Sequence, residues 1–413
     1  MNDWNQFARD ANDAMVWRKG EEEPKEGNDK DGLFAYQRKL LKKNPQKMFV
    51  LWPCGRGKTR MACEWAKQNG GSTLVVTTKG LQTQWAREIE KWDVVAGVCS
   101  KEHFKKGKPK FDNLIIDECD YFLSANFKSQ LSKSLRKYLK DYNPRLCMMS
   151  AVMYRSSPWN VFTAASLLGL KWSYNAFRNT YFVPVMMGMR TIWMIKKDKT
   201  TQKRLRETIE RICETIDSAD DFEIPTHTYE TITIDEDDSQ RKAKADNHEI
   251  HHMSRFTKDH RAEAMNKNKW EQIEILCREN DKTIVVCRFI DQMDQMEEYL
   301  RARGHEVLKI WGGNINRQEV VDKAEKAERV VVIVQSDTVA GYELPSFRVM
   351  IFASMSYSTY SHTQVVGRND RINAIAKNTY IYLSAGECDR AIKASVDKNQ
   401  NFDPLLFYKY NNA

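Results

Sequence analysis

Short β-rich runs alternate with helical or loop-like stretches in two separate parts of the chain, and this alternation limits the folds that the chain can adopt. The two series are residues 48–52, 73–78, 113–117 and 146–152, and then residues 283–289, 329–335, 348–353 and 378–385. Strands that alternate with helices form parallel sheets whose two faces those helices cover. The pattern therefore predicts an α/β protein with two parallel-sheet domains in tandem.

The composition around these series predicts the domain boundaries. Residues 1–31 carry nine acidic and five basic side chains and have little to bury, so we expect an acidic N-terminal extension. Residues 32–230 form the predicted first domain, which ends in an insertion at about 155–230 that we expect to be mostly helical. Residues 231–413 form the predicted second domain, introduced by a charged linker helix. A chain of 413 residues is long enough for this organisation.

Charge and residue usage limit the partners of the protein. The net charge is +9, and residues 32–413 alone carry +13. A basic body of this kind favours a polyanionic partner, although it is also an ordinary solubilising surface.

The nine cysteines form no CxxC pair, so neither a disulfide framework nor a thiolate zinc site is expected. No apolar run approaches the ~20 residues of a membrane span and the start of the chain lacks a signal pattern, so we expect a cytoplasmic protein without a membrane partner.

A glycine-rich segment follows the first β-rich run, in the sequence WPCGRGKTRMACEW at 52–65. Gly55 and Gly57 allow the backbone to wrap closely around an anion, and the start of the following helix directs its amides at it. Lys58 would neutralise nucleotide phosphates, and Thr59 would offer its hydroxyl to Mg²⁺. The strict phosphate-loop pattern has one more glycine at its start, so a glycine-rich turn with an incidental lysine is the alternative.

An acid pair ends the third β-rich run, in the sequence NLIIDECD at 113–120. Asp117 would hold Mg²⁺, together with Thr59, and Glu118 would orient and deprotonate the attacking water. Acidic pairs at strand ends are also common as solvated loop residues. The position of this pair, about sixty residues after a glycine-rich lysine–threonine loop, favours the catalytic interpretation.

At this point the chain resembles the superfamily-two helicases and translocases, and is most similar to the Swi/Snf-type ATPases in their compact, phage-encoded form. The resemblance covers about residues 34–413. It depends on segments in the order and spacing of that family: FAYQ (34–37), TLVVTTKGLQTQWAREIEKW (73–92), DECD (117–120), SAV (150–152), the segment 158–182, TIVVCRFIDQMDQMEEYL (283–300), the segment 311–344, QVVGRNDRI (364–372) and GECDRAIKASVDKNQNF (386–402).

The resemblance implies two RecA-like domains that bind ATP and Mg²⁺ in the cleft between them. The nucleotide-binding residues that the motifs supply are Gln37, which would read the adenine edge, Gly55, Arg56, Gly57, Lys58, Thr59, Asp117 and Gly341. The catalytic residues are Glu118, Gln364 and two arginine fingers, Arg368 and Arg371, which reach the γ-phosphate from the second domain.

The function that the resemblance implies is ATP hydrolysis coupled to movement on DNA, with duplex DNA, held by contacts to its backbone, as the preferred track. A strand-separating or branch-migrating helicase is the alternative within the class. An ATP-switched nucleic-acid clamp or loader without motor activity is the alternative from another class, and an RNA-dependent ATPase also fits the motifs. The sequence shows no obvious wedge for strand separation, although a short hairpin would escape detection.

Three further segments have chemistry that the motifs do not use. Histidines in the segment 248–252 have the spacing of a two-ligand metal face, but no third ligand is near, so a solvated face is favoured. The basic runs 101–110 and 196–206 either follow nucleic-acid phosphates or are solvated faces, and Trp172 or Phe177 would lie near such a path.

Overall fold

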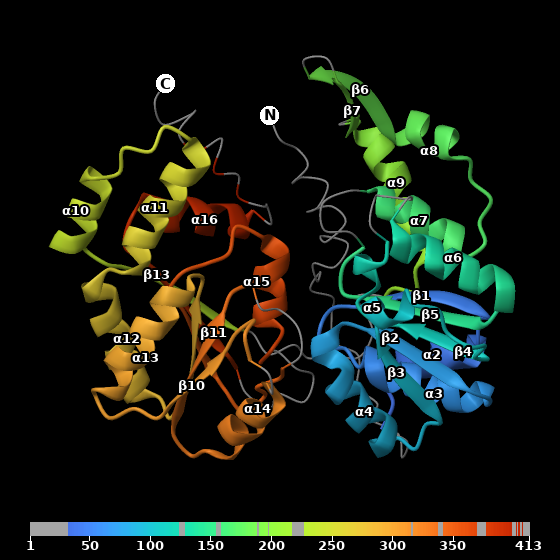
Figure 1. Cartoon of the computed structure of the whole chain (residues 1–413), viewed down its shortest axis with the longest axis horizontal. Helices are drawn as coiled ribbons and strands as arrows, with labels where there is room; N and C mark the ends of the chain where they lie inside the picture. Colours follow the sequence, from blue (N-terminus) through green and yellow to red (C-terminus); the bar gives the residue numbers. More distant parts are fainter. Residues whose placement is uncertain are drawn as a thin grey trace, which may run out of the picture. The chain divides into compact units, whose positions relative to one another are not determined.

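The computed structural model describes residues 32–123, 129–153, 158–187, 190–196, 198–216, 227–314, 317–337, 342–369, 377–398, 402, 404 and 407. The chain divides into two compact units, Met1–Phe222 and Glu223–Ala413 (Figure 1). Each unit is built on its own parallel sheet, which confirms the predicted fold class. Among the helices described, none is long and apolar enough to cross a membrane.

The described part of the first unit contains a five-stranded parallel sheet with the strand order β1–β5–β4–β2–β3. Its strands are β1 (Lys47–Leu51), β2 (Thr73–Thr77), β3 (Ala96–Ser100), β4 (Asn113–Ile116) and β5 (Arg145–Ser150). β3 is absent from the sequence prediction because it lies at the sheet edge and buries only Cys99, so it has no apolar run. Leu51 lies opposite Ser150, and Ile116 lies opposite Met148. The carboxyl ends of β1, β5 and β4 are therefore neighbours.

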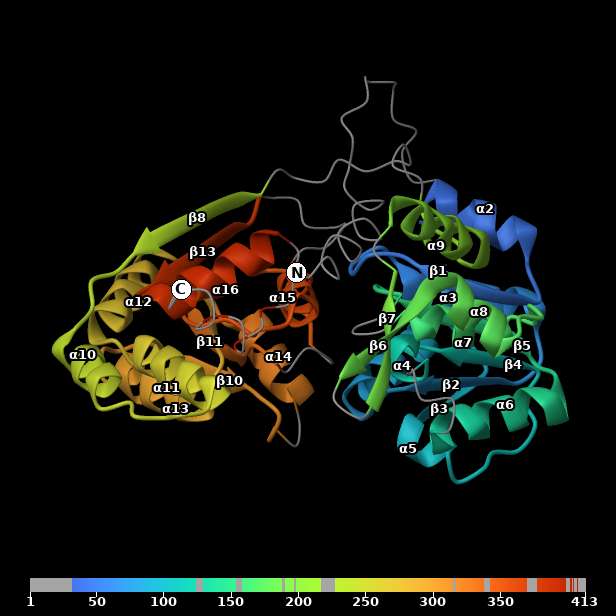
Figure 2. The same cartoon turned by 90° about the horizontal axis from the view of Figure 1, so that it is seen from above.

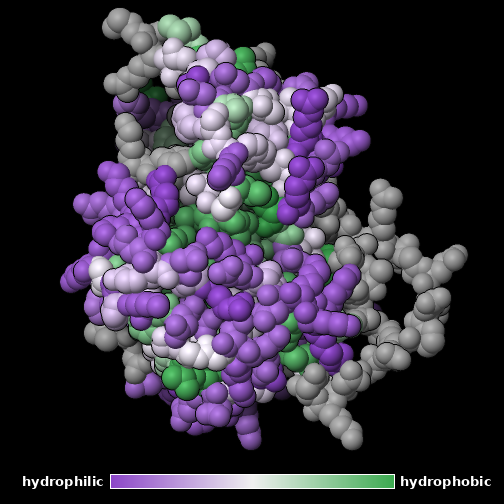
Figure 3. Space-filling view, turned by 90° about the vertical axis from the view of Figure 1, so that its right-hand side faces the viewer, coloured by the Kyte–Doolittle hydropathy of each residue, from purple (hydrophilic) through white to green (hydrophobic). Residues whose placement is uncertain are grey.

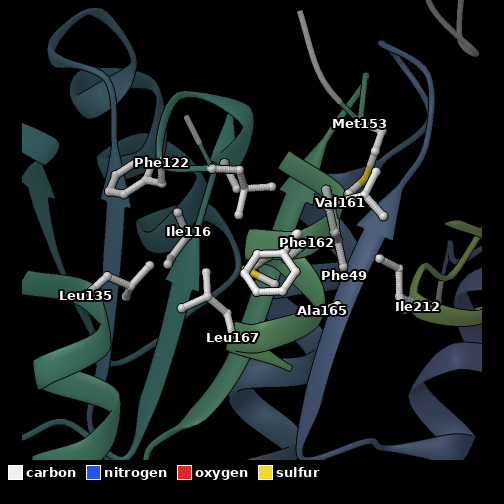
Figure 4. Packing of buried hydrophobic residues seen from close by; sticks show 14 of the residues in the cluster. Phe49, Ile116, Phe122, Leu135, Met153, Val161, Phe162, Ala165, Leu167 and Ile212 are labelled. Atoms are coloured by element: carbon white, nitrogen blue, oxygen red, sulfur yellow. The ribbon is translucent and has the colours of Figure 1, made fainter. Parts of the chain in front are cut away.

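Helices cover both faces of this sheet (Figure 1). One face carries α2 (Ala35–Lys43), α3 (Lys58–Asn69) and α4 (Gln82–Lys91), and the other carries α5 (Lys101–Phe104), α6 (Gln130–Tyr142) and α7 (Trp159–Leu167). Alternate strand residues point to opposite faces. On the second face Phe49 and Ile116 pack with Phe162 and Leu167 of α7, in one buried cluster (Figure 4). The helix that opens the insertion is thus part of the core of the first unit.

In the part that the structure describes, the insertion contains three helices and also an antiparallel hairpin that the sequence prediction did not include. After α7 come α8 (Tyr174–Tyr181), an antiparallel hairpin of β6 (Phe182–Met187) and β7 (Arg190–Ile195), and α9 (Lys199–Ile212). The hairpin escapes sequence analysis because its apolar residues do not alternate with polar ones: Val183 and Met186 are exposed. After α9 the chain returns to the sheet, where Glu214 exchanges backbone hydrogen bonds with Phe49 and Leu51.

The second unit contains, in its described part, a six-stranded parallel sheet with the order β10–β11–β9–β12–β13–β8. Its strands are β8 (Thr228–Thr233), β9 (Lys282–Cys287), β10 (Val307–Ile310), β11 (Val330–Gln335), β12 (Val349–Phe352) and β13 (Thr379–Ser384). Its helices are α10 (Asp238–Ala245), α11 (His252–Ala264), α12 (Lys267–Glu279), α13 (Ile290–Arg301), α14 (Arg317–Lys326), α15 (Thr359–Val366) and α16 (Glu387–Asp397). β8 lies at the edge of the sheet beside β13 (Figure 2) and is largely exposed. Its sequence is rich in threonine, tyrosine and isoleucine, which is a strand signal that the sequence prediction did not use. The boundary predicted at 230/231 falls inside β8.

A buried group of charged side chains joins three helices of the second unit. Lys269 on α12 is fully buried, and its Nζ donates to Asp389 Oδ2 at 2.7 Å and to the carbonyl of Ala353 at 2.9 Å. Glu263 on α11 accepts from the amides of Cys388 and Asp389, in the first turn of α16. Burial opposes ionisation of Asp389, but Lys269 and then a neighbouring histidine outweigh it and hold the pKa below its usual range. Charge pairing and helix capping therefore fix α16 against α11 and α12.

We expect Lys269→Met to destabilise the second unit by about 3–5 kcal/mol, because it leaves the Asp389 carboxylate buried without its cation. The free energy of unfolding from urea titration measures this. Lys258→Met, which breaks an exposed pair with Glu249, is the control and should change stability by less than about 1 kcal/mol. The folded-state pKa of Asp389 lies below the unfolded value, so its stabilisation is present above about pH 4 and is lost as the pH falls further. An unchanged unfolding free energy in Lys269→Met would contradict this.

Candidate active site

The glycine-rich loop lies between the end of β1 and the start of α3. Gly55 and Gly57 have φ values of +73° and +67°, which side chains rarely tolerate. Gly57 is the residue before α3, and Lys58 and Thr59 form the first turn of that helix, half-buried. The free amides and the partial positive charge of a helix start favour an anion at this position. The structure thus places these four residues where a phosphate group could be held.

Two side chains of α2 donate hydrogen bonds to backbone carbonyls of the glycine-rich loop. Gln37 is buried, and its Oε1 accepts from the amide of Phe34 at 2.8 Å while its Nε2 donates to the carbonyl of Gly57 at 2.9 Å. The hydroxyl of Tyr36 donates to the carbonyl of the buried Arg56 at 2.9 Å. A Cβ atom at position 57 would lie 2.5 Å from Gln37 Nε2. In this structure the Gln37 carboxamide, predicted to read adenine, therefore positions the loop.

The Lys58 ammonium group points back across the loop. Its Nζ donates to the carbonyls of Trp52 at 2.8 Å and Pro53 at 2.9 Å. These bonds hold the positive charge beside the start of α3. A bound phosphate would compete with the carbonyls for the ammonium hydrogens.

The first carboxylate of the acid pair is buried directly after β4. Asp117 Oδ2 accepts from Trp85 Nε1 at 2.8 Å and lies 3.5 Å from Thr77 Oγ1, while Oδ1 accepts from the amide of Glu118 at 3.0 Å. Burial, followed by the charge of Glu118, raises the pKa of Asp117 above its usual range, and the bond from Trp85 and the charge of Lys58 act in the opposite direction. A cation bound at this carboxylate would favour its ionised form.

The second carboxylate lies on a strained backbone. Glu118 has φ +47° and ψ +50°, the left-handed region that non-glycine residues seldom occupy. Its Oε2 is buried and has no hydrogen-bond partner among the described residues. Strain and an unpaired buried oxygen both cost stability, and such features concentrate at functional sites. The oxygen is available to accept a proton or to orient water.

The acid loop is also joined to the end of β5. Ser150 Oγ donates to Asp120 Oδ1 at 3.1 Å and accepts from the amide of Val152 at 3.2 Å. Ser150 and Trp85 lie in the segments 150–152 and 73–92, which resemble family motifs. The bonds of Ser150 to Asp120 and of Trp85 to Asp117 were not predicted. The only sequence signal was their place in those motifs, because the partners lie about 30 residues away along the chain.

The second unit holds Gln364 and Arg368, at and just after the end of α15. Arg368 is buried, and its guanidinium donates to Gln364 Oε1 at 3.0 Å and to the carbonyl of Tyr342 at 3.3 Å. Its own carbonyl accepts from the amide of Leu344. The predicted finger is thus anchored within its own unit. The other predicted residues of this unit, Arg371 and Gly341, lie outside the described residues.

The oxygen donors of the first unit suit Mg²⁺ and a nucleotide phosphate. Thr59 and Asp117 offer hard oxygens, and Gly57 lacks the Cβ that would fill the space behind the loop. Among the described residues no group of three or more His, Cys, Asp or Glu side chains could hold a metal by itself. Mg²⁺ commonly relies on one or two carboxylates together with substrate phosphates.

Comparison with known proteins places the fold. Residues 266–373 match the family "Helicase conserved C-terminal domain". The solved structure of S. cerevisiae Dbp5 bound to RNA and ADP BeF3 is similar, with a TM-score of 0.56 and 11% identity over 95% of this chain and 90% of that one. The SWI2/SNF2 ATPase core of Sulfolobus solfataricus in complex with dsDNA gives a TM-score of 0.40 and 14% identity over 92% and 93%. A comparison with curated proteins gives no match.

The chain therefore has the fold of a superfamily-two helicase core, with two RecA-like units in tandem. The compact, phage-type and Swi/Snf-like subclass stays a prediction.

We expect Trp85→Phe to weaken Mg²⁺-dependent ATP binding by about 10-fold or more, because it removes the donor to the buried Asp117 carboxylate and such bonds contribute about 1.5–3 kcal/mol. Titration with a fluorescent ATP analogue, with and without Mg²⁺, measures the change. Trp92→Phe is the matched control, since its indole donates to Glu88 instead. Equal affinities for both variants would show that the Trp85 contact has no role in the site.

Proposed function

We propose that the protein is an ATP-dependent motor that moves on, or remodels, nucleic acid. One observation supports this most: the glycine-rich loop follows β1 and the acid pair follows β4 at the same edge of the sheet, because β5 pairs in parallel with both strands. A loop that binds phosphate and a carboxylate that binds Mg²⁺ are the two parts that ATP hydrolysis needs near each other. The helicase fold puts them in the setting where they are used together.

The roles of the residues follow from their positions. Lys58 and the amides of α3 would bind the nucleotide phosphates, and Thr59 and Asp117 would hold Mg²⁺, which neutralises developing charge. Glu118 would orient the attacking water and take its proton through the unpaired Oε2. Gln37 and Tyr36 would keep the loop in shape through its carbonyls.

The second unit would supply the positive charge at the γ-phosphate when the two units close. We assign this role to Arg368 and Arg371, with Gln364 beside the nucleotide. Arg368 would have to exchange its bonds to Gln364 and Tyr342 for the phosphate, so Gln364 would hold the guanidinium until then. Hydrolysis would in this way depend on closure, which is what a motor requires.

Double-stranded DNA is the proposed track, and the basic body of the chain supports a polyanion. RNA is the rival, since Dbp5, which shares the fold, is bound to RNA in its structure. ATPase rates without polymer and with single-stranded, duplex and forked DNA and RNA distinguish these substrates. Stimulation by duplex DNA that falls steeply with salt supports the proposal. A rate that no polymer changes favours a nucleotide-switched clamp.

We expect Glu118→Gln to keep ATP binding but to lower turnover by about 10²–10⁴-fold, because a positioned base is lost. Lys58→Ala should lose ATP binding, since the charge that meets the phosphates is gone. Equilibrium binding and steady-state turnover on the same preparations separate the two effects. Wild-type turnover in Glu118→Gln would remove Glu118 from the mechanism.

We expect Arg371→Ala to bind ATP nearly as the wild type does, yet to lose most of its polymer-stimulated turnover, because an arginine that acts mainly in the transition state raises turnover more than affinity. Arginine fingers contribute about 10³–10⁵-fold elsewhere. Arg371→Lys should not restore the rate, because a point charge does not reproduce the planar guanidinium. Full stimulation in Arg371→Ala would contradict the finger assignment.

A further inference from the structure

The insertion of the first unit is strongly basic. No Asp or Glu occurs from residue 142 to residue 197. Residues 158–206 carry nine basic side chains and one acidic one, a net charge of +8 in a chain whose total is +9. These residues form α7, α8, the β6–β7 hairpin and the first half of α9. These basic residues therefore lie on one part of the fold, outside the phosphate loop and the acid pair.

A rigid aromatic cluster lies within this charged insertion. The ring of Trp159 stacks on Tyr174 at 4.8 Å and on Phe182 at 4.2 Å between centroids, and it also contacts Phe177. Trp172 packs against Phe177 at 5.4 Å. Phe177 is buried, so of the two aromatic residues that the sequence suggested near a nucleic-acid path only Trp172 has a ring open to contact.

Two members of the cluster remain open to solvent. Trp172 is 39% exposed and Tyr174 is 45% exposed, although both are fixed from below by buried rings. The neighbouring Leu170 is also exposed, and Figure 3 shows hydrophobic surface between two hydrophilic regions at the height of α6 and α7. Rings held in place lose little conformational freedom when they bind a partner, which makes them good contact residues.

Two cationic residues are near these rings in the chain. Lys171 is exposed and precedes Trp172 in the chain. Arg178 lies one helical turn after Tyr174 on α8, so the two share a helix face, and its guanidinium stacks on Trp193 of β7 at 4.2 Å. We call Lys171, Trp172, Tyr174 and Arg178 the insertion surface.

We propose that the insertion surface binds an unpaired nucleic-acid strand, with bases stacked on Trp172 and Tyr174 and phosphates near Lys171 and Arg178. The positive charge selects a polyanion. The exposed rings select a strand whose base faces are free, because in a duplex those faces are already stacked on one another. The biological role of the insertion surface, which is to hold a strand that the motor has opened, rests on the proposed function. The binding itself does not.

Equilibrium binding of the nucleotide-free full chain tests the surface independently of hydrolysis. The probes are fluorescent 20-mers of dT and of U, a 20-base-pair DNA duplex, and a poly-glutamate peptide. We expect Trp172→Ala/Tyr174→Ala to bind the single strands about 10- to 100-fold more weakly, which corresponds to about 1.4–2.7 kcal/mol of lost stacking, and to bind the duplex within about 2-fold of the wild type. A larger loss for dT than for U, or the reverse, identifies the strand chemistry within the proposal.

Three further variants and a stability check keep this test decisive. Tyr142→Ala removes another exposed aromatic ring of the first unit, on α6, and should leave single-strand affinity unchanged. Lys171→Gln should lower the slope of log affinity against log salt by about 0.7, the value for one contact to a single strand. Thermal unfolding must match the wild type, and Trp172→Phe should keep most of the affinity because it keeps a ring.

Three results would overturn the inference. One is unchanged single-strand affinity in the folded double variant, and another is an equal loss for duplex and single strands. The third is poly-glutamate binding that matches single-strand binding and falls equally in the double variant, which would indicate an acidic protein partner. None of these results bears on Glu118→Gln turnover, so failure here is distinct from failure of the motor proposal.

Discussion

The parallel arrangement of β1, β5 and β4 is the constraint on which the candidate site depends. Parallel strands bring their carboxyl ends to one edge of a sheet, so the segments that follow them meet although they are far apart in sequence. The glycine-rich loop follows β1, the acid pair follows β4 and Ser150 ends β5. Because β5 pairs with both of the others, Ser150 can bond to Asp120 while the charge of Lys58 acts on Asp117.

The site also contains a buried carboxylate and strained backbone conformations, which cost stability. Contacts from the rest of the first unit must offset that cost. Asp117 is buried, Glu118 occupies the left-handed region, and two glycines of the loop have positive φ values. Supporting contacts come from outside the loop: Gln37 and Tyr36 hold its carbonyls, and Trp85 donates to the buried carboxylate. A rigid surrounding structure is what allows a strained acid to persist in one conformation. The second unit uses a related device, in which Lys269 and Glu263 hold Asp389 and the start of α16.

The insertion contributes both to the core of the first unit and to its exposed surface. Its helix α7 belongs to the apolar core over the sheet, whereas Trp172 and Tyr174 face solvent among basic residues. The same segment therefore has two roles: one side stabilises the unit, and the other remains available for a partner.

The sequence by itself determined the two α/β blocks, the loop at Gly55–Thr59 and the acid pair, because strand–helix alternation and short motifs are local patterns. The sequence prediction did not include β3, which buries one residue at the sheet edge, nor β8 and the β6–β7 hairpin. The sequences of β8 and the hairpin favour strands, but their place in the fold depends on which segments become neighbours. Only the tertiary structure decided that Gln37 bonds to the loop and that Trp85 bonds to Asp117. It also decided that Phe177 is buried while Trp172 is exposed. Such outcomes depend on which side chains are neighbours after folding, and residues 20 to 40 positions apart carry no local sign of that.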